Sequence, residues 1–502
     1  MKKMNSGKDL ISCFLAVFLL SFAPVSAQHV LTLDECREMA LEQNKKIRMA
    51  KEDAEIAGLT KKVAATKYLP NFSFNGGYLR LNKAFKPLGS DMFLPVVPYN
   101  SIDPLTGAFN PASLHDPATA LNTFVMNPQT GQPMLDASGN PVFKNYALLP
   151  ADKMTMDFKD NYFAFLTVTQ PLFTGFKITE SNNIAKYAEN IAKENVVLTK
   201  AEVLVKTDKA YWQVVSLQEK VKLANSYEAL LDQLVTDLEN MYAEGIIIRN
   251  DLLKAQVNQN EARLKVMKAE NGLALAKMAL AQIIGMENEN ITLPENVIDK
   301  GLSGAYSMMN PGNTSDKRAE VIMLKEKLSI MESSKNIERS KFMPDILLTG
   351  GYGWMNPNPY NGLNKEFGGD WSVGVVVSMP IFTWGERKHN MSTANIKKQK
   401  AQLELDEARE MIDLQIRQNH YKYNESIKKA ELTQLSKVQA EENMKMAKEN
   451  LLEGRTRLTE LLEAQVQWEN ASSEYIDALI EIKTTLSELE KSTGEIYRHL
   501  DN

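Results

Sequence analysis

The sequence predicts a mainly α-helical chain with a smaller β part that meets a membrane, and three observations support this fold class. Residues 176–243 and 386–452 contain no proline, and as α-helices each run would span about 100 Å, too long for a compact domain. Four segments of about ten residues alternate apolar and polar side chains, as strands do. The elements recur in the same order, which indicates an internal two-fold repeat.

The N-terminal residues 1–27 have the features of an export signal peptide. Lysines precede the apolar stretch Leu10–Phe22, and small residues then allow cleavage before Gln28. Lipidation at Cys13 is an alternative, but that cysteine lies near the start of the apolar stretch, so cleavage there would leave an apolar new N-terminus. Export leaves one thiol, Cys36, which we expect to be a buried residue of the first helix.

Three pairs of matching blocks define the repeat. They are KYLPNFSFNGGY from Lys67 with KFMPDILLTGGY from Lys341, TQPLFTGF from Thr169 with SMPIFTWG from Ser378, and the segments from Ala243 and Leu452. The first pair is offset by 274 residues and the others by 209, so the first copy carries a 65-residue insertion. We therefore predict a first repeat at residues 28–285, a linker at 286–315 and a second repeat at 316–502.

The insertion falls within residues 79–160, between the two strands of the first copy. It holds ten of the nineteen prolines and is rich in glycine and asparagine. Because proline removes a backbone donor and breaks helices, we expect a long loop without helix.

The strands have one apolar face and one polar face. Pro171 and Pro380 are predicted to end the second strand of each copy. A strand of ten residues is long enough to cross a bilayer when tilted, although a soluble sandwich is an equally good interpretation of the strands alone. If the sheet lies in a membrane, the side chains expected to face lipid are Leu348, Tyr352, Trp354, Trp371, Val373, Val375 and Val377, with Ser372 and Ser378 on the other face.

The long helical runs have the apolar spacing of coiled coils. From Leu458 to Leu489 ten positions, all apolar or aromatic except Gln465 and Ser472, alternate steps of three and four residues, which keeps one seam buried. Gly245 and Gly454 interrupt the two runs at equivalent places, and helix resumes directly after each. We therefore predict two antiparallel helical hairpins with a glycine at each tip.

Four strands cannot close a barrel, yet an open sheet edge in lipid leaves costly unpaired backbone groups. The chain must then combine strands with copies of itself. Two chains supply eight strands and three supply twelve, and only the larger barrel leaves room for a passage.

In the order, repetition and spacing of these blocks the chain resembles the TolC-like outer-membrane efflux proteins over essentially its whole mature length. The resemblance implies a homotrimer with a 12-stranded barrel in outer-membrane lipid, a periplasmic tunnel of helices, and the role of a passive exit duct in tripartite efflux or type I secretion. It places the loop at residues 79–160 at the extracellular mouth and the linker at 286–315 in the middle of the tunnel. It also implies docking of a periplasmic adaptor that joins the duct to an inner-membrane pump. The docking residues it suggests at the tips are Gly245, Asn250, Asp251, Gly454 and Thr456.

Two aromatic residues depart from the family pattern. Relatives often have two glycines after the Leu-Phe that ends the second strand of the first copy, whereas Phe176 follows Gly175 here and Trp384 precedes Gly385 in the second copy. Aromatic rings are common where membrane proteins meet the interface, so we expect an aromatic girdle there.

A polar stripe follows the seam of the last helix at Glu460, Glu463, Gln467, Asn470 and Glu474. One interpretation is a solvated outer face. The other is that the stripe lines the tunnel, with Glu460 and Glu463 near the aperture and Asp251 as the matching acid of the first copy.

Several function classes lack support. The net charge of −5 speaks against nucleic-acid binding, and the five scattered histidines and single mature cysteine fit no metal, cofactor or catalytic motif. The methionines are better explained as adaptable core residues than as a copper relay. Two rivals remain: a secreted or surface coiled-coil adhesin, which would not need duplicated strands, and a periplasmic adaptor, which would have one hairpin. The exported substrate and the role of the insertion are not determined.

Overall fold

The computed structural model describes residues 30–108, 110–287, 291–294 and 315–500. The predicted signal peptide, Cys13 and most of the linker at 286–315 lie outside these ranges. The chain forms two compact units, a helical one (residues 1–67, 175–343 and 380–502) and a strand-rich one (68–174 and 344–379). Both predicted repeats contribute to each unit, and the repeat boundaries stay a prediction.

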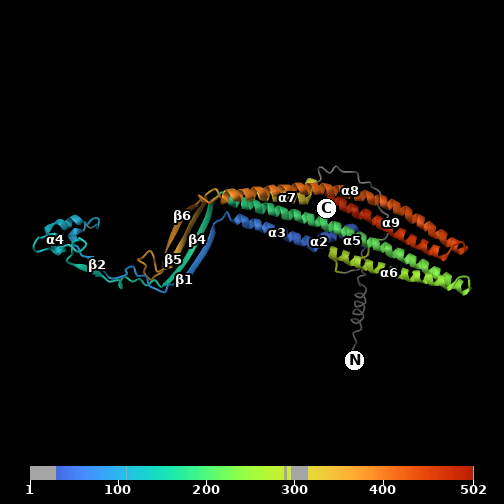
Figure 1. Cartoon of the computed structure of the whole chain (residues 1–502), viewed down its shortest axis with the longest axis horizontal. Coiled ribbons are helices and arrows are strands. Elements are labelled where there is room, and N and C mark those ends of the chain that lie inside the picture. Colours follow the sequence, from blue (N-terminus) through green and yellow to red (C-terminus); the bar gives the residue numbers. More distant parts are fainter. Residues whose placement is uncertain (1–29, 109, 288–290, 295–314, 501–502) are drawn as a thin grey trace, which may run out of the picture. The chain divides into compact units, whose positions relative to one another are not determined.

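The helical unit consists of long helices that run alongside one another (Figure 1). They are α2 (Leu33–Gln43), α3 (Lys45–Thr66), α5 (Lys177–Ala243), α6 (Arg249–Ile284), α7 (Ala319–Ser340), α8 (Glu386–Leu452) and α9 (Leu458–Thr493), with short turns of 3-10 helix, η4 (Ser315–Lys317) and η5 (Glu495–Leu500). The helices α5 and α8 have 67 residues each, and α6 and α9 have 36 each. No helix in the described part of the chain is long and apolar enough to cross a membrane.

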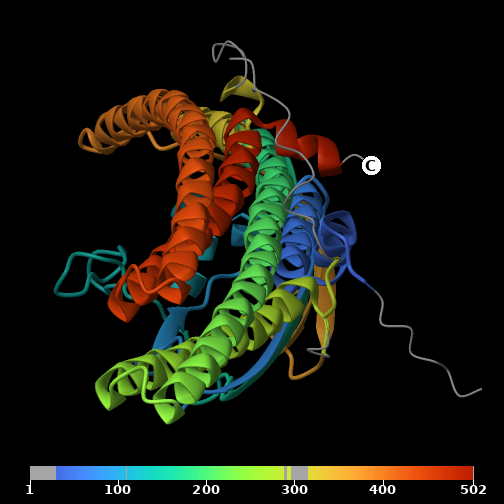
Figure 2. The same cartoon turned by 90° about the vertical axis from the view of Figure 1, so that its right-hand side faces the viewer.

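The two predicted hairpins are present. The helix α6 folds back on α5, and α9 folds back on α8, with α5 and α9 in contact between the pairs (Figure 2). The predicted seam of α9 is buried at Leu461, Leu479 and Ile482. Leu461 packs with α5 and α6 in an apolar cluster near the tips, whereas Leu479 and Ile482 belong to a second cluster that includes residues of α2 and α5. Heptad spacing had therefore identified the buried side of this helix correctly.

A break in the first helical segment was not expected from the sequence. Asn44 separates α2 from α3, and its side chain accepts a hydrogen bond from the backbone N–H of Lys46 at 2.9 Å. The same side chain donates to the carbonyl of Ile283 at 2.8 Å, which ties the break to the end of α6. Cys36 of α2 is fully buried, as predicted, and burial raises the pKa of its thiol to about 12.

A buried ion pair joins α2, α5 and α9. The Arg37 guanidinium donates two hydrogen bonds of 2.7 Å to the carboxylate of Asp208, and the Ser487 hydroxyl donates a third of 2.7 Å. Burial alone lowers the pKa of Arg37, but the hydrogen bond and charge of Asp208 outweigh it, so the pKa is raised. Residues from three distant parts of the chain are thus held at one point.

The strand-rich unit contains a four-stranded antiparallel sheet. Its strands are β1 (Asn71–Arg80), β4 (Asp160–Thr174), β5 (Asp345–Asn356) and β6 (Gly368–Ser378), in the spatial order β1-β4-β5-β6. The prediction that Pro171 ends a strand is wrong, because β4 continues to Thr174. β1 begins at Asn71, which pairs with Thr169, so the part of β4 after Thr169 pairs only with β5. The register between β4 and β5 shifts between Pro171 and Phe173, and this irregularity accommodates the missing N–H of Pro171.

The insertion contains more regular structure than the sequence suggested. It includes a two-stranded antiparallel sheet of β2 (Met92–Pro95) and β3 (Tyr146–Leu149), the turns η1 (Tyr99–Ser101) and η2 (Pro111–His115), and the helix α4 (Pro117–Thr123). The expectation of no helix is therefore wrong. Proline is tolerated at the first position of α4, where no backbone donor is needed, and the Asp116 carboxylate caps the helix by accepting from the N–H of Thr119 at 3.0 Å.

Candidate transport surfaces

The two hairpin tips have the same backbone geometry. Gly245 and Gly454 have φ angles of 74° and 71°, in the left-handed region that glycine adopts without strain. After each glycine the next N–H reaches back five residues, from Ile246 to the Met241 carbonyl at 2.9 Å and from Arg455 to the Asn450 carbonyl at 2.8 Å. Both tips therefore use the same glycine-dependent helix cap.

The predicted docking residues lie on or beside these tips. Asn250 is exposed, whereas Asp251 and Thr456 are partly buried. Thr456 donates its hydroxyl to the carboxylate of Glu460, and Lys254 lies 3.5 Å from Asp251. Docking itself stays a prediction.

Sequence reasoning missed two tip residues. Ile246 and Ile248 are both largely exposed beside Gly245. Isoleucine is usually buried in folded chains, so an exposed pair at a turn is a signal of a contact surface. The run of three isoleucines after Gly245 could have identified it.

A variant of Gly454 tests the tips. We expect Gly454→Ile to impair transport without reducing the amount of assembled protein, because a β-branched residue resists the left-handed conformation. A Cβ at this position would meet no atom within 4 Å, so strain is confined to the backbone. The measurement is export by cells with matched protein levels. Gly454→Asn, which tolerates this conformation, is the control and should retain transport; normal transport by Gly454→Ile would contradict the prediction.

The polar stripe of α9 is exposed at every predicted position. These residues are Glu460, Glu463, Gln467, Asn470 and Glu474. In the described part of the chain no cation lies within ion-pair distance of Glu460 or Glu463, whereas Asp251 has Lys254 beside it. Of the three predicted aperture acids, the two on α9 therefore have no basic partner among the described residues, and Asp251 has one. Exposure agrees with both the tunnel and the outer-face interpretation, so the choice between them stays open.

The strand register separates the sheet into two faces. Tyr352 lies opposite Trp371, Leu348 opposite Val375, and Ile346 opposite Val377, and directly paired residues share a face. All seven predicted lipid-facing side chains consequently lie on one face, continued on β1 and β4 by Phe72, Phe74, Leu166 and Val168. Ser372, Ser378, Thr167 and Thr349 lie on the other. Lipid contact remains to be tested.

The aromatic residues at the strand–helix junctions are unusual in conformation. Phe176 and Trp384 have φ angles of 70° and 49°, where non-glycine residues are uncommon. Trp384 is 88% exposed and contacts the ring of Phe382 edge-on. A role as membrane-interface anchors stays a prediction.

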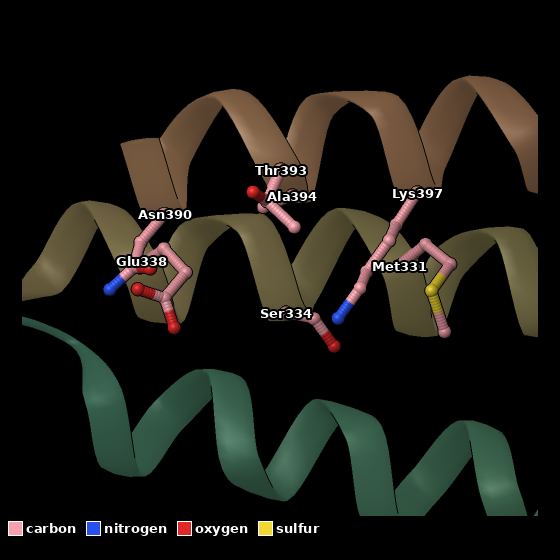
Figure 3. A pocket seen from close by; sticks show the side chains of 7 residues that line it. All are labelled: Met331, Ser334, Glu338, Asn390, Thr393, Ala394 and Lys397. Atoms are coloured by element: carbon pink, nitrogen blue, oxygen red, sulfur yellow. The ribbon is translucent and has the colours of Figure 1, made fainter. Parts of the chain in front are cut away.

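The recess between α7 and α8 shows no arrangement for catalysis. It has a volume of about 190 Å³, and Figure 3 shows Asn390 beside Glu338 within it. Glu338 is already paired with Lys341 at 2.8 Å. Among the residues that the structure describes, no three His, Cys, Asp or Glu side chains are placed to hold a metal ion. The absence of enzymatic activity stays a prediction.

Comparison with known proteins decides the family. The model of the outer membrane efflux protein family matches residues 136–286 and 323–495, more than half of the chain. The chain belongs to this family. The location predicted from the sequence, an outer membrane with the helical part in the periplasm, agrees with that membership.

The individual relatives compared with this chain are similar to it at low sequence identity. The alkaline protease secretion protein AprF of Pseudomonas aeruginosa is 21% identical over 263 residues, which is 49% of this chain and only about half, 52%, of AprF. The outer membrane protein TolC of Vibrio cholerae is 19% identical over 313 residues, 61% of this chain and 70% of TolC. A crystal structure of CusC, which forms a transmembrane channel, matches with a TM-score of 0.68 at 13% identity, covering 92% of this chain and 91% of that one. The fold predicted from the sequence, mainly helical with a strand part, is confirmed by this likeness.

Proposed function

We propose that the chain is the outer-membrane exit duct of a tripartite efflux or type I secretion system. Three copies form one 12-stranded barrel, the helical hairpins extend it through the periplasm, and their tips dock a periplasmic adaptor that connects to an inner-membrane pump. Membership of the efflux family and the likeness to a secretion protein support both classes of system.

The amphipathic sheet with two free edges carries this proposal. Within the described residues β1 and β6 each pair on one side only, and β6 runs antiparallel to β1 across the sheet. An unpaired edge cannot remain open in hydrocarbon, and the direction of the strands allows β6 of one copy to pair antiparallel with β1 of the next. Three copies then continue one apolar outer face and one polar inner face.

Apolar stripes on the outside of the hairpins support association between copies. Exposed apolar side chains recur at steps of three to eight residues along α6, as expected for a seam that packs on a neighbouring helix, and others lie along α8. On α6 they include Leu253, Val257, Leu264, Met267, Leu275 and Met278, and on α8 Leu403, Met411, Leu414, Leu432 and Leu435.

Cysteine labelling in intact outer membranes tests the duct. A membrane-impermeant thiol reagent should label Ser372→Cys and Ser378→Cys through the water-filled lumen, and Val375→Cys and Val377→Cys should react only with a lipid-soluble reagent. Cys36 gives little background, because it is buried and its pKa is raised to about 12. Crosslinking of the same membranes should yield a trimer. Identical labelling of the two sets, or a monomer, would overturn the proposal.

A further inference from the structure

The polar face of the sheet carries an aromatic pair among small and polar side chains. Phe163 and Phe165 lie on the same face as Thr167 and Thr169, because successive side chains of β4 alternate between faces. Their ring centroids are 5.9 Å apart, and the rings remain 38% and 37% exposed. The sequence already assigns Thr167 to the polar face of its strand. Because every second side chain of a strand lies on the same face, Phe165 and Phe163 could have been assigned to that face from the sequence.

Glycines on both neighbouring strands make room for the two rings. A Cβ at Gly77 of β1 would lie 2.6 Å from Cζ of Phe163, and a Cβ at Gly353 of β5 would lie 2.7 Å from Cε1 of Phe165. Each ring thus lies close to a glycine on a strand beside β4, and such coverage of glycine also stabilises a sheet. The outer surfaces of the rings stay accessible.

The rings line a recess on this face. It has a volume of about 300 Å³ and is bordered by Asn161, Phe163, Phe165 and Met355. Met355 lies directly opposite Phe163, so its thioether is on the same face as the rings. The same face consists mainly of serine, threonine, asparagine and glycine elsewhere, including Ser73, Asn75 and Ser372.

We propose that Phe163, Phe165 and Met355 form a binding site for aromatic groups of the molecules that pass through the duct. Aromatic rings attract other rings through stacked and edge contacts, and methionine sulfur also interacts favourably with aromatic rings. An accessible apolar recess on a polar surface selects molecules with an apolar or aromatic part over fully hydrated ones. The inference rests on the proposed function, because it requires this face to line the lumen, and it adds a preferred class of small-molecule cargo.

Block of single-channel current tests the site in the reconstituted full-length protein. The probes are benzyltrimethylammonium and (cyclohexylmethyl)trimethylammonium, which have the same charge and nearly the same size but differ in aromaticity. We expect the aromatic ion to block the native channel at lower concentration. In the Phe163→Leu/Phe165→Leu variant, the concentration of the aromatic ion that gives half-maximal block should rise about tenfold, to the value for the cyclohexyl ion. The reason is that one good aromatic contact contributes up to about tenfold in affinity.

Matched variants separate this inference from the duct itself. Leucine still covers Gly77 and Gly353, so the sheet should keep its packing. Phe72→Leu/Phe74→Leu makes the same change on the opposite face of the sheet and should leave block by both ions unchanged. A native protein that forms no channel would overturn the proposed function. A channel whose preference for the aromatic ion survives in Phe163→Leu/Phe165→Leu, or is absent from the native protein, would overturn the binding site alone.

Discussion

Asp208→Ala is expected to destabilise the folded chain by about 3 to 5 kcal/mol, because it leaves a buried cation without its partner. The Asp208 side chain is fully buried and that of Arg37 is only 13% exposed. Removing the carboxylate abolishes both guanidinium hydrogen bonds and the bond from Ser487. Since these residues belong to α2, α9 and α5, the loss should loosen the packing of three helices. Thermal unfolding of the full-length protein in detergent, followed by circular dichroism, measures the effect.

Asp34 provides a matched control for this pair. It also interacts with Arg37, at 3.5 Å, but its side chain is 84% exposed. Exposed ion pairs contribute about 0 to 1 kcal/mol, so Asp34→Ala should unfold almost like the native protein. The double variant Arg37→Met/Asp208→Leu should recover much of the loss, because it removes both buried charges. If Asp208→Ala unfolds at the same temperature as Asp34→Ala, the buried pair does not hold these helices together.

Glu460→Gln/Glu463→Gln is expected to abolish cation preference in single-channel recordings. Both carboxylates are exposed, and in the described part of the chain neither has an ion-pair partner, so their charge is not neutralised locally. Three copies would place six such carboxylates around one aperture, where like charges add to a negative potential that attracts cations. The effect should be strongest at low salt, since screening shortens to about 8 Å at physiological ionic strength.

The same six carboxylates should make the native channel sensitive to divalent cations, because closely spaced like charges favour a bound cation. The double variant should lose this block. Asp477→Asn/Glu481→Gln on the same helix is the control, because it removes equal charge, but each of these acids already has a lysine at 2.7 Å. Unchanged ion selectivity in a correctly assembled Glu460→Gln/Glu463→Gln trimer would show that the stripe faces outward.

Local patterns in the sequence were sufficient for the helices and for the faces of the strands. A buried seam requires side chains that recur at steps of three and four, and Leu461, Leu479 and Ile482 are buried members of such a series. The tips could be located for a similar reason, because Gly245 and Gly454 adopt a conformation that other residues avoid. Likewise, alternation in β5 and β6 was enough to group all seven predicted lipid-facing residues.

Features that depend on contacts between distant segments could not be predicted in this way. The extension of β4 beyond Pro171 depends on where β1 begins opposite it. The short helix α4 depends on its N-cap Asp116, which was overlooked because the many prolines of the insertion had indicated a loop. The tip isoleucines and the aromatic pair of β4 were overlooked, although a run of three isoleucines after Gly245 indicates the first and the alternation of side chains along β4 indicates the second.

The sequence by itself determined the helix lengths, the hairpin tips and the amphipathic strands, because each depends on periodicity and backbone preference within one segment. Only the tertiary structure decided that Arg37 meets Asp208, since 171 residues separate them. It also decided that Phe163 and Phe165 cover glycines of two other strands, because strand register sets which residues face each other. Contacts of this kind depend on how elements pack, and no local pattern encodes the packing.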